Sequence, residues 1–207
     1  MRLARLSLGH VFVANMTGNV VFLAFALAGA PGFSILASLV ALGAFVLGSF
    51  GGGLLGSRLG QHRGHLLSVA AALQTLLLMV AAVLAALAGN PVSTGGSLGL
   101  IVVLGVAMGL QNATARKLVV PDLTTTVLTL TIVGMAADSR VVGGSGSRAG
   151  RRLIAVAAMF VGALVGSLLI FHVSIVTPLV IALIVLALIA GATRLLSRTD
   201  PDWVRAS

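Results

Sequence analysis

Three long stretches without a formally charged residue constrain this chain more than any other feature. They cover residues 6–57, 64–115 and 153–193, which are 52, 52 and 41 residues long. A typical soluble domain is about 25% charged, whereas this chain is 8% charged and 58% hydrophobic. A soluble fold of this size could not hide that much apolar surface from water. We therefore predict an all-α integral membrane protein.

Each charge-free stretch has room for two membrane-spanning helices, because one crossing needs about 20 residues. Glycine, proline and polar residues mark a break within each stretch, at residues 29–32, 89–97 and 172–178. We expect about five to six full transmembrane helices plus one or two short or broken helices. Residues 1–207 would form a single transmembrane domain.

A fourth apolar piece, Leu123–Ala137, is 15 residues long and rich in threonine, which is short for a full crossing. If it enters the bilayer and returns, all five clusters of basic residues and the C-terminus face the cytoplasm. If it crosses fully, the arginine-rich loop at 140–152 and the C-terminus lie outside. Cytoplasmic loops are enriched in Lys and Arg, so the four arginines of that loop favour the re-entrant interpretation.

The sequence also contains an internal repeat of weak similarity. Residues 16–23 align with 123–130, and residues 44–52 align with 158–166. We infer two repeat units, 1–90 and 97–197, of which only the second begins with a full helix. The chain would then lack its first crossing, as if its start lay too far downstream. An odd number of crossings in each complete unit would invert one unit relative to the other, as in many transporters.

The N-terminal segment Val11–Ala28 has three interpretations. Charge counting makes it a full crossing, whereas the repeat makes it a short segment that enters from the outside. We favour the short segment, because inverted repeats commonly carry paired broken helices. A signal peptide that ends at Ala26-Leu27-Ala28 is the third interpretation. The polar residues at 15, 17 and 19 interrupt the apolar core that a signal peptide needs.

Polar residues cluster in the two short segments, and polar groups within a membrane are costly and often functional. The candidate binding residues are Asn15, Thr17, Gly18 and Asn19 in the first set, and Gln111, Asn112, Arg116, Asp122, Thr124, Thr125 and Thr126 in the second. Asp122 or Thr124 would cap the second short helix, and Thr17 would cap the first. The two helix N-termini, with Arg116 nearby, would favour a small polar or anionic solute. The alternative is that these side chains hydrogen-bond across helices and hold the bundle together.

Glycines spaced four residues apart form stripes at 48, 52 and 56, at 105 and 109, and at 162 and 166. Such stripes let membrane helices pack closely. The alternative is that they form sliding surfaces for alternating access.

Several segments resemble a known family. They are Gly9–Val21, the run Gly-Leu-Gln-Asn-Ala at 109–113 with Arg116, the run Pro-Asp-Leu-Thr-Thr-Thr-Val-Leu-Thr at 121–129, and the segment from Gly134 to Ser139. Together they resemble the YoaK-type family of bacterial inner-membrane proteins, known as domain of unknown function 1275. Members usually carry one more helix before the first of these segments. The resemblance implies about six helices, a bacterial inner-membrane location and a transporter, with no established activity to carry over.

We therefore expect a small-solute transporter or channel with its site between two short helices, and as the alternative a non-transporting structural or interaction protein. An enzyme is not expected, because the sequence has no cysteine and no grouping of a nucleophile with a base. The four histidines have no metal-ligand spacing, so neither a metal nor another cofactor is predicted. The net charge of +9 comes from basic clusters between apolar blocks. It therefore indicates the lipid bilayer as a partner and not nucleic acid.

Overall fold

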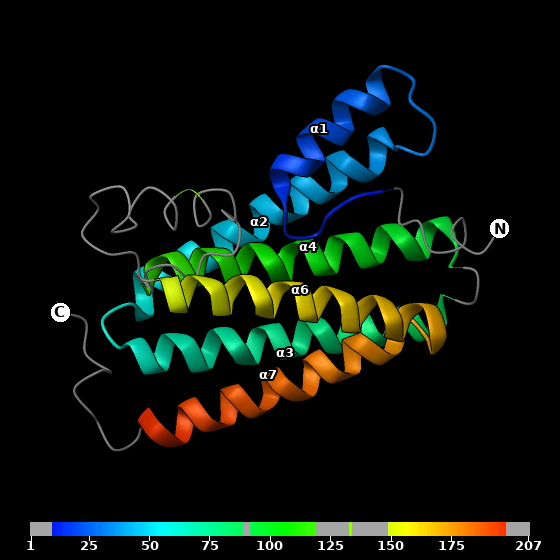
Figure 1. The fold of residues 1–207 in the computed structure, drawn as a ribbon. Coiled ribbons are helices and arrows are strands. Elements are labelled where there is room, and N and C mark those ends of the chain that lie inside the picture. The colour runs from blue at the N-terminus through cyan, green and yellow to red at the C-terminus, as the bar shows by residue number, and fades with distance from the viewer. Residues whose placement is uncertain (1–9, 89–91, 119–132, 134–148, 198–207) are drawn as a thin grey trace.

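The computed structural model describes residues 10–88, 92–118, 133 and 149–197, and its regular structure in these ranges is helical. The helices in Figure 1 are α1 (Met16–Leu27), α2 (Ile35–Leu59), α3 (Arg63–Leu87), α4 (Thr94–Lys117), α6 (Ala149–His172) and α7 (Val176–Leu196). Five of these described helices, all except α1, are long and apolar enough to cross a membrane. This confirms the all-α membrane fold, and each charge-free stretch holds two helices as predicted.

Helix α1 is the short helix of the N-terminal region. Its 12 residues correspond to about 18 Å, against a hydrocarbon core of about 30 Å. The short-segment interpretation of Val11–Ala28 therefore describes the helix better than a full crossing does. Our choice of cap was wrong. The helix begins at Met16, so Thr17 lies in its first turn, and Asn15 is the N-cap whose side chain accepts from the Gly18 N–H at 3.3 Å.

The turn between α1 and α2 is built around two glycines. Gly29 and Gly32 have φ angles of 81° and 87°, a left-handed backbone that favours glycine. His10 Nδ1 lies 2.7 Å from the carbonyl oxygen of Gly32, which ties the segment before α1 to this turn. Ser34 then caps α2, and its hydroxyl accepts from the Ala37 N–H. The break predicted at 29–32 is therefore confirmed.

The tightest helix contact in the described structure joins α2 and α4 through their glycine stripes. A Cβ atom added to Gly48 would lie 2.1 Å from the carbonyl oxygen of Val106, and one added to Gly109 would lie 2.1 Å from that of Phe45. A Cβ atom added to Gly105 would lie 2.9 Å from the side chain of Ala44. Glycine is required here because the two backbones touch, which confirms close packing for these two stripes.

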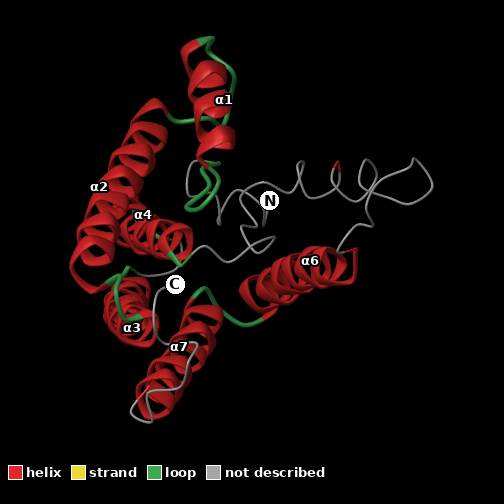
Figure 2. Ribbon diagram, turned by 90° about the vertical axis from the view of Figure 1, so that its left-hand side faces the viewer, coloured by secondary structure: helices red, strands yellow, loops and turns green. Residues whose placement is uncertain are grey.

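The third glycine stripe does not pack as expected among the described residues. A Cβ atom at Gly162 or Gly166 would have no atom within 4 Å. The reason is the position of α6. It contacts α7 and stands away from α2 and α4, as Figure 2 shows. Close packing therefore holds for α2 and α4 and fails for α6 in this part of the structure.

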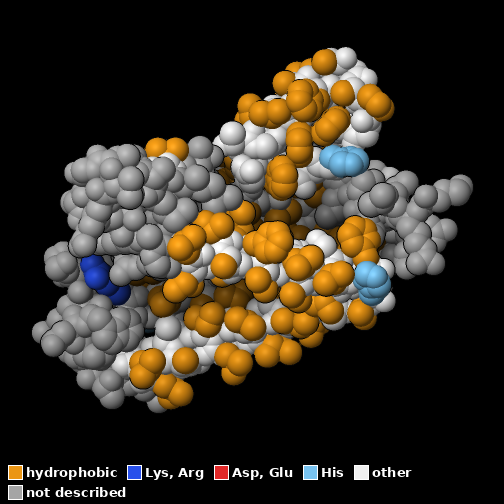
Figure 3. Space-filling model, viewed as in Figure 1, with side chains coloured by type: hydrophobic (Ala, Val, Ile, Leu, Met, Phe, Trp, Pro, Cys, Tyr) orange, Lys and Arg blue, Asp and Glu red, His pale blue; other side chains and the backbone are white. Residues whose placement is uncertain are grey.

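The described basic residues gather at one end of the bundle. Helices α2, α4 and α7 end there with basic residues in their last turns, and α3 begins there with Arg63. On the face drawn in Figure 3, the described Lys and Arg side chains lie at this end, and apolar side chains cover much of the helices. We call it the basic end. The connections at residues 28–34 and 173–175 lie toward the opposite end and contain neither Lys nor Arg.

Helix α4 ends and α6 begins at the basic end. The predicted re-entrant segment Leu123–Ala137 between them lies outside the described residues. Helix α2 runs toward the basic end, whereas α6, its counterpart in the proposed repeat, runs away from it. The repeat units 1–90 and 97–197 stay a prediction, and these opposite directions are those that an inverted repeat requires.

Candidate functional site

Asn19, in the first predicted set, hydrogen-bonds to both backbone groups of Phe12, and its Nδ2 also donates to Met16 Sδ at 3.5 Å. Its side chain is 0% exposed. Its Oδ1 accepts from the Phe12 N–H at 2.8 Å, and its Nδ2 donates to the Phe12 carbonyl oxygen at 2.6 Å. A side-chain amide has the same donor and acceptor as a peptide group, so it can satisfy both backbone groups of an extended residue. This pair, which we call the Asn19 clamp, holds the chain before α1 against the helix.

Gly18 lies next to the Asn19 clamp. A Cβ atom at this position would lie 2.6 Å from the ring of Phe12, so glycine leaves the space that the ring occupies. The Phe12 ring also stacks on Phe22 at a centroid distance of 5.2 Å. Thr17 is exposed, and none of the hydrogen bonds in the described structure uses its hydroxyl. The first set therefore forms a folded entry to α1 with one exposed hydroxyl.

The second predicted set lies at a different level of the bundle. Val11, next to the clamp, packs on a small core formed by Ala37, Ala41 and Ile101, and Ile101 is in the first half of α4. Gln111 follows Ile101 by ten residues, or about 15 Å along the helix axis. The described structure therefore brings Asn15–Asn19 close to the beginning of α4, while Gln111, Asn112 and Arg116 lie toward its end.

Gln111 joins α4 to α3 through a side chain that the sequence analysis did not include. Gln74 of α3 is 6% exposed. Its Nε2 donates to Gln111 Oε1 at 3.1 Å and to the Ala107 carbonyl oxygen at 3.2 Å. Gln74 is the twelfth of the 25 residues of α3, so its side of this amide pair lies near the middle of that helix. We call it the Gln74–Gln111 pair.

The signal for Gln74 was available in the sequence. It is the only Gln, Asn or charged residue between Gly64 and Gly89, deep in the second charge-free stretch. Clusters of polar residues were weighed as candidates, whereas this isolated one was passed over. A lone polar residue in a membrane span meets the same desolvation cost as a clustered one, and it was an equal candidate on that ground.

The pair leaves hydrogen-bonding capacity free. In the described part of the chain, no hydrogen bond uses Oε1 of Gln74 or Nε2 of Gln111. Gln111 is exposed, and the next residue, Asn112, donates through Nδ2 to the Met108 carbonyl oxygen at 2.8 Å. One acceptor, on Gln74 near the middle of α3, and one donor, on Gln111 toward the end of α4, are therefore unused in the described structure.

The remaining candidates do not complete a second site within the described residues. Arg116 is exposed in the last turn of α4, at the basic end. Four predicted residues lie outside the described ranges: Asp122, Thr124, Thr125 and Thr126. The proposed meeting of two short-helix N-termini therefore stays a prediction.

Comparison with known proteins places the chain in a family. Residues 3–192 match the model of a family described as a protein of unknown function, DUF1275. The chain belongs to this family. A DUF1275 assignment agrees with the resemblance carried by the segments around residues 9–21 and 109–139, and it leaves the activity open.

This DUF1275 chain is 36% identical over 138 residues to the UPF0700 transmembrane protein YoaK of Bacillus subtilis (strain 168). The match covers 64% of this chain and 58% of that relative, so it spans well under two thirds of the relative's length. No solved structure matches this chain. The relative supports a multi-pass membrane protein, and neither comparison supplies a substrate.

Proposed function

We propose that this DUF1275 protein is a small-solute transporter or channel of the bacterial inner membrane, and that it carries a polar or anionic solute past the Gln74–Gln111 pair. The observation that carries the proposal is the free acceptor and free donor of this pair, of which Gln74 lies near the middle of α3. Polar groups at that depth are costly, so their presence favours a functional role.

The directions of the helices support the proposal. In the predicted repeat, α2 corresponds to α6 and α3 corresponds to α7. The members of each pair run in opposite directions, and α3 packs directly against α7. Transporters with inverted repeats place the solute site near the interface between the repeats at mid-membrane depth. Gln74 belongs to the first predicted repeat unit and Gln111 to the second, so the proposal puts the amide pair at that interface.

The distribution of basic residues supports one orientation of the protein in the membrane. The described basic residues lie at one end, and Lys and Arg are enriched on the cytoplasmic side of inner-membrane proteins. The proposal therefore places the basic end and the C-terminus in the cytoplasm. It assigns the protein no enzymatic activity and no cofactor.

The competing function is a structural or interaction protein, and one observation favours it. The Asn19 clamp satisfies the buried amide entirely within α1 and its preceding segment, as a purely structural polar residue would. The two functions differ at the Gln74–Gln111 pair. A structural role needs only the bond between the two amides, whereas a transport role also needs the groups that this bond leaves free.

Uptake into proteoliposomes tests the proposal. The purified protein is reconstituted and screened with radiolabelled small polar and anionic solutes against empty liposomes. We expect saturable uptake of at least one solute, with a loss of tenfold or more in Gln74→Leu and Gln111→Leu. Gln61→Leu is the matched control, because the same change falls in the turn between α2 and α3. Asn19→Ala and Arg116→Ala then ask whether the two predicted sets contribute to the same path.

Two results would contradict transport through the pair. One is the absence of uptake above empty liposomes for every solute in the screen. The other is uptake that remains at the wild-type rate in both glutamine variants while their unfolding is also unchanged. Uptake that falls only in proportion to a loss of folded protein would support the structural function instead.

A further inference from the structure

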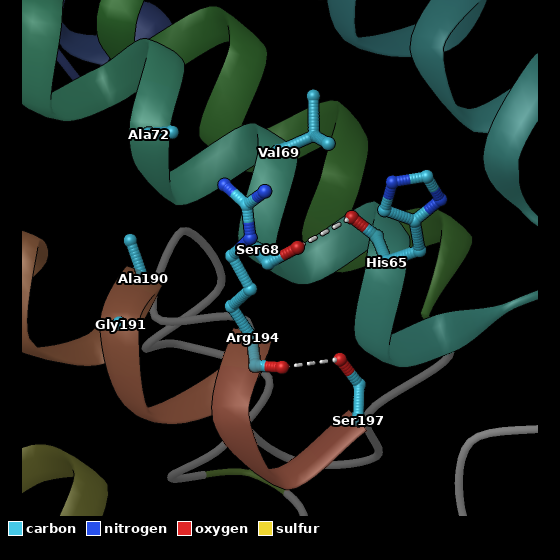
Figure 4. A pocket seen from close by; sticks show the side chains of 8 residues that line it. All are labelled: His65, Ser68, Val69, Ala72, Ala190, Gly191, Arg194 and Ser197. Carbon is cyan, nitrogen blue, oxygen red and sulfur yellow. Dashed lines mark hydrogen bonds between the residues drawn. The ribbon is translucent and has the colours of Figure 1, made fainter. Parts of the chain in front are cut away.

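A second polar site lies between α3 and α7 at the basic end, separate from the Gln74–Gln111 pair. It is an open cavity of about 440 Å³. Its polar lining comes from His65 and Ser68 in the first turns of α3 and from Arg194 and Ser197 at the end of α7. Figure 4 shows the side chain of Arg194 extending from α7 toward Ser68 of α3. The mouth of the cavity thus combines a guanidinium group, an imidazole and two hydroxyls.

The arginine in this mouth has no counter-ion among the described residues. The four acidic residues of the chain are at positions 122, 138, 200 and 202, all outside the described ranges. The hydroxyl of Ser197 donates to the backbone carbonyl of Arg194 at 3.1 Å, and that of Ser68 donates to the carbonyl of His65 at 3.0 Å. Neither bond uses the guanidinium group. Within the described residues its five N–H donors are therefore available for an anion, and a phosphate can accept from a guanidinium through two oxygens at once.

The opposite part of the cavity is apolar and made of small side chains. Val69 and Ala72 lie further along α3, and Ala190 and Gly191 lie before Arg194 on α7. These four residues lie further from the basic end than the polar mouth does, because α3 begins at that end and α7 finishes there. A Cβ atom at Gly191 would meet nothing within 4 Å, so this apolar part of the cavity is open. We call the surface formed by these four residues the apolar channel.

We propose that this cavity binds an anionic phospholipid, with the headgroup phosphate on Arg194 and the start of an acyl chain along the small residues. The two-part lining carries this inference. A free phosphate would need only the polar mouth, whereas a lipid also needs the apolar channel below it. Basic pockets between transmembrane helices on the cytoplasmic side are known to suit anionic headgroups. The proposal does not depend on whether the protein transports a solute.

Native mass spectrometry of the full chain in an uncharged detergent tests this site. Phosphatidylglycerol and phosphatidylcholine of equal chain length are titrated, and inorganic phosphate in large molar excess is added as a competitor. We expect saturable, tighter binding of phosphatidylglycerol, weakened about fivefold or more in Arg194→Gln. Arg58→Gln is the matched control, because it removes the same charge in the last turn of α2, outside the cavity. Arg194→Lys keeps the charge and should retain most of the binding.

The apolar channel is tested separately. Gly191→Leu places a larger side chain in the open, apolar part of the cavity. It should therefore weaken phosphatidylglycerol binding and leave the fold intact. Equal binding of the two lipids, or equal losses in Arg194→Gln and Arg58→Gln, would overturn the site. If inorganic phosphate displaces the lipid and Gly191→Leu has no effect, the cavity is a site for a free anion, and the assignment to a lipid is overturned.

Discussion

Replacing Gly48 with alanine tests the contact between α2 and α4 directly. The new Cβ atom would lie 2.1 Å from the carbonyl oxygen of Val106 and 2.8 Å from its Cα atom. Both obstacles are backbone atoms, so no side-chain rotation can relieve them. Ordinary van der Waals contact begins at 3.4 Å, so the two helices must separate locally by about 1.3 Å. That separation also loosens the neighbouring contact of Gly109 with Phe45.

Forced overpacking of this kind costs about 1–3 kcal/mol of unfolding free energy. The matched control is Gly53→Ala on the same helix, where a Cβ atom would meet nothing within 4 Å. Alanine is favoured over glycine in a helix by up to about 1 kcal/mol, so this control should be neutral or stabilising. The two substitutions are chemically identical, yet only Gly48→Ala should lower the unfolding free energy. Combining Gly48→Ala with Gly109→Ala should cost less than the sum of the two, because one separation of the helices relieves both clashes.

The assay is reversible unfolding of the purified protein from mild detergent into dodecyl sulfate, followed by far-ultraviolet circular dichroism. Unfolding free energies for the wild type, the three single variants and the double variant come from the same titration. The reasoning would be refuted if Gly48→Ala were as stable as Gly53→Ala. Strict additivity in the double variant would show that the two clashes are relieved by separate movements.

Three further predictions use the same assay. Asn19→Leu should lower the unfolding free energy by about 2 kcal/mol, because both backbone groups of Phe12 lose their partner. Faster proteolysis before α1 should accompany this loss. Wild-type stability in this variant would argue against the Asn19 clamp. Ser38→Ala should be neutral or stabilising by about 1 kcal/mol, because the Ser38 hydroxyl is buried with no hydrogen-bond partner in the described structure; destabilisation would mean that this hydroxyl has one. Gly162→Leu should change stability by less than about 0.5 kcal/mol, because its Cβ would meet open space; a large loss would reveal a helix packed on this face of α6.

Much of the candidate site was beyond sequence reasoning for identifiable reasons. Asn15 and Asn19 were found because polar residues in an apolar segment are visible in one dimension. Their roles were not found, since the bond between Asn19 and Phe12 depends on how the chain folds back before α1. Gln74 was missed because its partner, Gln111, is 37 residues away in sequence and on another helix. The cavity at Arg194 likewise needs α3 and α7 side by side, and no local pattern records that pairing.

The sequence by itself determined the membrane class, the number of helices in each charge-free stretch and the gathering of the described basic residues at one end. These properties follow from the transfer of side chains between water and lipid, which depends on composition and order along the chain. Only the tertiary structure decided that the glycine stripes of α2 and α4 meet while that of α6 meets no described helix. Lipid tails are as apolar as leucine, so burial alone gives membrane helices little preference for one neighbour over another. The choice of neighbour rests on shape and on a few hydrogen bonds, which exist only once the helices are in place.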